Sequence, residues 1–118
     1  MDSRAKSAEP EPPAAVAVVI DRMWVRFLPA FRERVRLLDA AAQAAGADRL
    51  GDDLRRQALG AAHKLAGSLG TFGLERGTEL ARTLETRYAE GRLQPSDAAA
   101  LAEAASEIRS MIESRKTA

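Results

Sequence analysis

The chain has no cysteine, which excludes disulfide bonds, thiolate nucleophiles and zinc–thiolate sites and is compatible with a reducing compartment. Aromatic residues make up only 4% of the 118 residues, so a hydrophobic core has to be built from leucine, valine, isoleucine and alanine. These side chains suit closely packed helices. A chain of this length has room for one core, so we expect one folded domain.

An excess of one charge sign is also lacking, because 18 basic residues face 17 acidic ones and leave a formal charge of +1. A protein that neutralises nucleic-acid phosphates needs a stronger positive balance, so we expect no nucleic-acid partner. The arginines Arg32, Arg34 and Arg36 do not change this expectation, since residues two apart on a helix point in different directions. Glu33 and Asp39 dilute them further.

No apolar run approaches the roughly 20 residues that a membrane span requires, so we expect no membrane segment and a cytoplasmic location. Residues 1–13 are polar and rich in proline, and they lack the apolar core of a signal peptide. Such a segment cannot offset the entropy of ordering it, so we expect a disordered leader. The folded domain is expected to cover residues 14–115.

Between residues 14 and 45, apolar side chains recur every three or four positions, which is the pattern of an amphipathic helix. Pro29 interrupts the backbone of this stripe but not its phase, and Gly46 can close it. The pattern predicts either a short extra N-terminal helix followed by a second helix near Pro29, or one kinked helix. The stripe consists of Ile20, Trp24, Phe27, Phe31, Val35, Leu38, Ala42 and Ala45.

Three further helices follow from the same periodicity. The first is capped by Asp48 and fades between Gly70 and Gly73; the second runs from about Leu74 to Glu90 and is ended by Gly91. The last begins after Pro95, with Ser96 or Asp97 as its cap. Short connections favour antiparallel neighbours, so we expect an all-α, antiparallel up-down four-helix bundle with a short extra N-terminal helix. The inward positions are Leu50, Leu54, Ala58, Ala61, Leu65 and Leu69; Leu74, Ala81, Leu84 and Tyr88; and Leu101, Ala105, Ile108 and Ile112.

His63 is the only histidine, and at ~100° per residue it lies roughly 170° around its helix from the centre of the apolar stripe. Gly60 and Gly67 flank it at i−3 and i+4, together with Leu59 and Ala66. Each glycine costs a helix about 1 kcal/mol relative to alanine, so two beside one exposed imidazole indicate clearance for a partner. Two alternatives stay open: an idle surface histidine, and glycines that admit another helix.

An exposed neutral imidazole keeps a nucleophilic nitrogen that can attack a phosphoryl group. Arg56, two turns earlier, and Lys64, the next residue, could offset the added negative charge.

The segments AHKLAGS at residues 62–68 and LGTFGL at residues 69–74 resemble the signature of histidine phosphotransfer domains. His63, Leu65, Gly67, Gly73, Leu74 and the pair Leu84–Glu85 stand at matching places. One position departs, because Ala66 stands where the family usually has a lysine. Lys64 lies about 100° from His63 around the helix, so it replaces that lysine only by curling back.

The resemblance implies a phosphorelay intermediate, in which His63 accepts a phosphoryl group from an aspartate of a response-regulator receiver domain and donates it to another. The expected partner is a receiver domain, with a hybrid sensor histidine kinase as a second candidate. The chain has no nucleotide loop and no acidic cluster spaced for magnesium, so we expect no kinase activity, metal or cofactor of its own, and Mg²⁺ only on the receiver. The expected docking surface comprises Leu59, Gly60, Ala66, Gly67 and Gly70, with Arg56, Gln57 and Lys64 at its rim.

The main alternative is an adaptor bundle that binds a receiver or a kinase without being phosphorylated, which the substitution at Ala66 keeps open. Val19, Leu37 and Leu59 lie off the apolar stripes and make self-association conceivable. Scattered apolar residues are common on monomer surfaces, so we expect a monomer.

Overall fold

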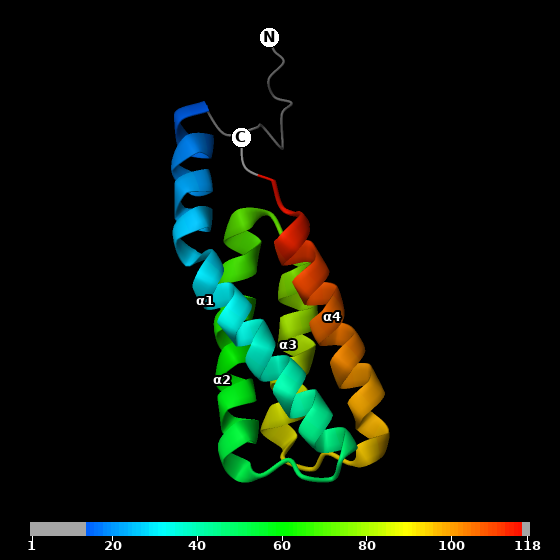
Figure 1. Cartoon of the computed structure of the whole chain (residues 1–118). Helices are drawn as coiled ribbons and strands as arrows, with labels where there is room; N and C mark the ends of the chain where they lie inside the picture. Colours follow the sequence, from blue (N-terminus) through cyan, green and yellow to red (C-terminus); the bar gives the residue numbers. More distant parts are fainter. Residues whose placement is uncertain (1–13, 117–118) are drawn as a thin grey trace.

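The computed structural model describes residues 14–116, and the leader expected at residues 1–13 lies outside this part of the chain. The described residues form four α-helices: α1 (Ala14–Gly46), α2 (Asp52–Ser68), α3 (Glu75–Glu90) and α4 (Ala98–Ser114). Two short 3₁₀ helices, η2 (Leu69–Phe72) and η3 (Pro95–Asp97), precede α3 and α4. Each helix packs against the next along the chain and α4 packs against α1, which closes the bundle (Figure 1). The expected all-α bundle is confirmed.

Helix α1 is one helix of 33 residues with Pro29 inside it, so the separate short N-terminal helix is not formed. The alternative of a single interrupted helix is the one that the structure adopts. Figure 1 shows that the blue N-terminal part of α1 and its cyan part run in different directions. A proline has no N–H to donate to the carbonyl one turn earlier, and its ring crowds that carbonyl, which explains the bend.

The core forms along the apolar stripes that the sequence predicts, with Trp24, Phe31, Leu65 and Tyr88 among its fully buried side chains. Burial raises the pKa of Tyr88 to about 12. Phe27 is an exception, because it is 42% exposed and lines a hollow between α1 and the end of α2. Across that hollow, α2 presents only the small side chains of a glycine and a serine.

The helix ends differ from the expectations at two positions. Asp48 does not cap the second helix; it lies in the preceding turn at a φ of 57°, and Gly51 is the N-cap of α2. Asp97 does precede α4, but its side chain turns back to accept a hydrogen bond from the backbone N–H of Gln94. That bond, together with Arg87, lowers the pKa of Asp97. Gly91 ends α3 in the left-handed conformation, with a φ of 78°.

Helix α3 lies close against the end of α2. A Cβ atom on Gly77 would lie 2.9 Å from Cδ1 of Leu69, which is fully buried in η2. Glycine at this position therefore allows the two segments to approach. This contact fixes the level of α3 along α2 and so determines which side chains of the two helices face each other.

Arg115, just after α4, joins three parts of the fold. Its Nε donates a hydrogen bond of 2.9 Å to the carbonyl oxygen of Phe72, and Nη1 lies 3.3 Å from Oδ1 of Asp21. The guanidinium also stacks over the rings of Trp24 and Phe72, at 5.0 and 5.6 Å from their centroids. The start of α1, the turn after α2 and the end of α4 are thereby held together.

Candidate functional site

Helix α2 presents His63 to solvent, as the helical phase predicts. Its side chain is 73% exposed, whereas Ala62 and Leu65 on either side of it in the sequence are fully buried. The buried residues hold α2 in one rotation about its axis, so the imidazole has to point away from the core. A histidine serving the core is thereby excluded.

Glu85 on α3 holds the ring of His63. Nδ1 of the imidazole lies 2.7 Å from Oε2 of Glu85, whose side chain is 32% exposed. An ionised carboxylate can only accept a hydrogen bond, so Nδ1 carries the proton. In the neutral imidazole the other nitrogen, Nε2, then has a free lone pair, which makes Nε2 the nucleophilic atom.

The ring borders an open hollow between α2 and α3. The α2 side is lined by Arg56, Leu59, Gly60 and His63, and the α3 side by Glu85, Thr86, Ala89 and Glu90. Apart from the charged residues at its edges, the hollow consists of small or apolar side chains. A second protein can therefore approach the imidazole without displacing a helix of this one.

The two glycines near His63 leave space toward solvent. A Cβ atom built on Gly60 or Gly67 would meet nothing within 4 Å beyond its own helix. No other described helix therefore requires glycine at either position, which removes the alternative that these residues admit a neighbouring helix. Clearance around the ring remains as the physical reason for them.

The expected docking residues divide among three places. Leu59, Gly60 and Arg56 line the hollow with His63, although Nη2 of Arg56 already lies 3.0 Å from Oδ1 of Asp53. Gly67 lines the hollow between α1 and α2, and Gly70 lines another beside α3. Lys64 and Gln57 are exposed on α2 and line none of these hollows.

The expectation for Ala66 is wrong, because this residue is only 8% exposed and belongs to the core. It lies about 60° from His63 around the helix, and it packs in the core cluster. Ala66 thus contributes neither docking surface nor charge, and a long cationic side chain would have to leave the core to serve His63.

The residues of α3 are missing from the sequence-based site. In the sequence, the pair Leu84–Glu85 matches a family pattern, which gives Glu85 no specific role. The available signal was the phase of α3: Glu85 lies one turn from the inward positions Ala81 and Tyr88, at the margin of the stripe. Its level opposite His63 depends on the packing of α3 against α2, which periodicity does not reveal.

Exposed apolar side chains gather on the first half of α1. All six large hydrophobic side chains that are exposed in the described part of the chain lie within twelve residues: Val16, Val18, Val19, Met23, Val25 and Phe27. Met23 and Phe27 share a hollow with Gly67, one turn beyond His63 on α2. This apolar edge, defined by Met23, Phe27 and Gly67, therefore adjoins the histidine surface.

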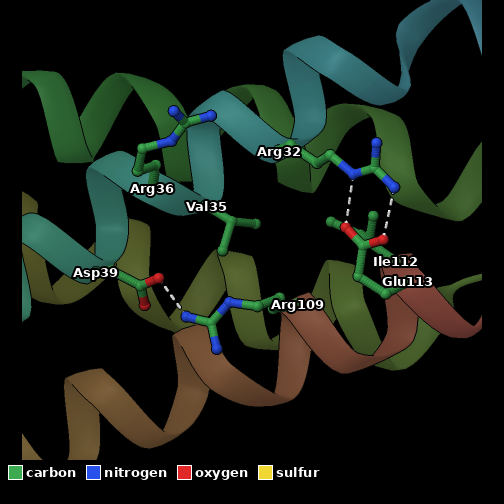
Figure 2. Close-up of a pocket in the computed structure, with 7 residues that line it drawn as sticks. All are labelled: Arg32, Val35, Arg36, Asp39, Arg109, Ile112 and Glu113. Atoms are coloured by element: carbon green, nitrogen blue, oxygen red, sulfur yellow. Dashed lines mark hydrogen bonds and ion pairs between the residues drawn. The ribbon is translucent and has the colours of Figure 1, made fainter.

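A cleft between α1 and α4 contains none of these residues (Figure 2). Arg32 forms two hydrogen bonds of 2.7 Å with Glu113 across it, and Arg109 pairs with Asp39. Val35 lies between the two ion pairs, and Ile112 lines the cleft beside Glu113. Each arginine of the cleft already has a carboxylate partner, since Arg36, which also lines it, pairs with Glu33 on its own helix. The cleft is therefore better suited to joining helices than to binding a ligand.

Within residues 14–116, no group of three or more histidine, cysteine or acidic side chains is arranged to hold a metal ion. None of the helices in that range has both the length and the apolar character that a bilayer crossing requires.

Comparison with known proteins agrees with the sequence motif and the fold. The family model described as Hpt domain matches residues 22–117. No match is found among curated proteins or among solved structures. Hpt domains are histidine phosphotransfer modules that work with response-regulator receivers and kinases in phosphorelays, and they are phosphocarriers rather than kinases. The match spans most of the chain and includes His63 and all but the first turns of the bundle, so this chain belongs to the Hpt domain family.

Proposed function

We propose that this chain is a phosphorelay intermediate that accepts and donates a phosphoryl group on Nε2 of His63. The observation that carries the proposal is the contact between Nδ1 and Glu85 on an otherwise exposed ring. It holds the imidazole in the tautomer and orientation in which Nε2 is the open nucleophile. Orientation of one nucleophile suits phosphoryl transfer, in which positioning and charge stabilisation do most of the work.

The donor is an aspartyl phosphate of a receiver domain. The lone pair of Nε2 forms a bond to phosphorus while the bond between phosphorus and the aspartyl oxygen breaks, and the aspartate leaves as a carboxylate. The imidazole becomes cationic without releasing a proton, since Nδ1 keeps its hydrogen. Glu85 stabilises that cation, and the reverse reaction returns the phosphoryl group to an aspartate.

Docking is proposed to use the surface on both sides of His63. Leu59 and Gly60 border the ring on one side, and the apolar edge of Met23, Phe27 and Gly67 borders it on the other. A receiver that covers both would exclude water from the transfer site. We expect Mg²⁺ to be held by that receiver, and the relay to operate in the cytoplasm.

Incubation with phosphorylated receiver domains tests the proposal. An acid-labile, alkali-stable label should appear on the wild-type chain and be absent from the His63→Gln variant. The matched control is Gln57→Ala, which changes an exposed α2 residue outside the hollow and should label normally. Binding of a receiver without any label, across all receivers of the same cell, would instead establish the non-phosphorylated adaptor.

A further inference from the structure

Arg82 on α3 is a cation without a partner beside the site. It lies one turn before Glu85, and among the described residues it makes no hydrogen bond or ion pair. Glu79 and Glu85 flank it at i−3 and i+3, but both are engaged elsewhere. Oε1 of Glu79 lies 3.6 Å from Nη1 of Arg76, and Oε2 of Glu85 contacts His63.

The position of Arg82 places it within reach of the imidazole. Residues three apart on a helix have Cβ atoms about 5–6 Å apart, and Glu85 touches the ring directly. Arg82 also lines a hollow with Gly70, which lies in η2, seven residues after His63. Its side chain therefore belongs to the α2–α3 surface, between the level of His63 and that of Gly70, and its long stem can swing toward either.

A phosphoryl group on His63 needs positive charge that α2 does not readily supply. It adds between about one and a half and two negative charges to a hollow that already contains Glu85 and Glu90. Arg56 is paired with Asp53, and Lys64 lies about 100° around the helix from His63. Arg82 is the uncommitted cation next to Glu85.

We propose that Arg82 neutralises the phosphoryl group on His63 through charge-assisted hydrogen bonds from its guanidinium to the phosphoryl oxygens. Phosphorylation thereby joins α2 to α3 through a new contact that the unmodified protein lacks. The biological source of the phosphoryl group rests on the proposed function above, whereas the contact can be tested without a receiver.

Phosphoramidate, a small-molecule phosphoryl donor, provides that test. Nε2 forms the new P–N bond as the P–N bond of phosphoramidate breaks and ammonia leaves. A ³¹P NMR titration then reports how tightly the phosphoryl group on His63 binds its last proton. A nearby guanidinium favours the dianion, so Arg82→Gln should bind that proton about two- to five-fold more tightly than wild type, the range of an exposed ion pair.

Matched variants distinguish a direct contact between Arg82 and the phosphoryl group from the long-range electrostatic effect of removing any positive charge. Arg82→Lys should retain most of the wild-type behaviour. Arg49→Gln removes the same charge before the start of α2, which begins eleven residues or about 16 Å from His63, and should leave the titration unchanged. Equal titrations for wild type and Arg82→Gln would overturn the proposal, as would an equal effect of Arg49→Gln or a larger effect of Lys64→Gln or Arg56→Gln.

The outcome is distinguishable from failure of the phosphorelay function. If the chain exchanges phosphate with receivers but Arg82→Gln leaves the protonation of the phosphoryl group unchanged, the proposed function stands and the Arg82 contact is refuted. A chain that shows the Arg82 effect with phosphoramidate but never labels from a receiver keeps the contact and loses the relay.

Discussion

The α1–α4 side and the α2–α3 side of the bundle use polar side chains in opposite ways. Across α1 and α4, Arg32 with Glu113 and Arg109 with Asp39 form two ion pairs that face each other over an apolar strip (Figure 2). Across α2 and α3, the side chain of His63 contacts that of Glu85, and Arg55 donates a hydrogen bond to the backbone carbonyl of Tyr88. One side is joined by mutually neutral pairs, and the other keeps a reactive nitrogen unpaired. We infer that stability and reactivity are assigned to different sides.

The largest expected effect is a loss of stability on the α1–α4 side. Ile112→Ala removes a side chain that is 2% exposed and lines the cleft between α1 and α4, so it should cost about 2–5 kcal/mol of unfolding free energy. Urea unfolding measures this, with the exposed Ser110→Ala on the same helix as control. Phosphotransfer by the folded fraction should be unchanged. A tenfold loss of transfer in folded Ile112→Ala would show that the two sides are coupled.

The next effect lies on the open side and concerns transfer. Glu85→Ala removes the group that orients Nδ1, and a charge-assisted hydrogen bond worth about 1.4 kcal/mol corresponds to a tenfold slower transfer. Glu85→Gln keeps an acceptor oxygen and should lose less. Glu90→Ala is the matched control, since Glu90 lines the same hollow without a hydrogen bond to the ring. The check is the rate of phosphotransfer between each variant and the same receiver domain. Equal rates for Glu85→Ala and Glu90→Ala would refute the orienting role of Glu85.

Glycine substitutions sharpen the comparison further. Gly60→Ala should raise the unfolding free energy by about 1 kcal/mol, because its Cβ meets nothing beyond its own helix and alanine is the better helix former. Gly77→Ala should do the opposite, since its Cβ would lie 2.9 Å from buried Leu69. Thermal melts of both variants provide the check. A loss of stability in Gly60→Ala would mean that the open side is packed after all.

The smallest expected effect is on the stability of the fold at low pH. The hydrogen bond from Arg32 lowers the pKa of Glu113 below its usual 4.5, so the pair stabilises the fold above that pH and the stabilisation is lost as the pH falls through the lowered pKa. The two side chains are 51% and 42% exposed, so solvent weakens the ion pair and the melting temperature should change by at most a few degrees. In Glu113→Gln, the melting temperature should fall less steeply as the pH is lowered. If the melting temperature of Glu113→Gln falls with pH as steeply as that of the wild type, the loss of stability in acid belongs to other carboxylates, Asp97 among them.

Helical periodicity predicts most of the bundle because burial follows the phase of each helix. The outward direction of His63 and the burial of Leu65, Leu84 and Ile108 follow from spacing alone. The exposure of Phe27 does not, since it depends on the small residues that α2 places opposite. The expectation for Ala66 failed for a related reason: it lies at the margin of the outward face, where the packing of neighbouring helices, and not helical phase, decides burial.

The site was only half predictable for the same physical reason. Everything on α2 can be placed relative to His63 by counting residues, but Glu85 reaches the imidazole from another helix, with Arg82 one turn before it. Their level is set by how α3 seats against η2, where Gly77 meets Leu69. That contact joins segments whose relative position no single-helix pattern encodes. The part of the site on α3 therefore becomes apparent only in three dimensions.

The position of Arg115, one residue after the end of α4, matters for the choice of domain boundary in truncated or fused proteins. Helix α4 ends at Ser114, so a boundary chosen by helix ends alone would discard the next residue. That residue carries the guanidinium that stacks on Trp24 and Phe72 and hydrogen-bonds the carbonyl of Phe72. Truncations or fusions joined before it would leave an aromatic cluster uncovered at the end of the bundle, and expression fragments should include residue 115.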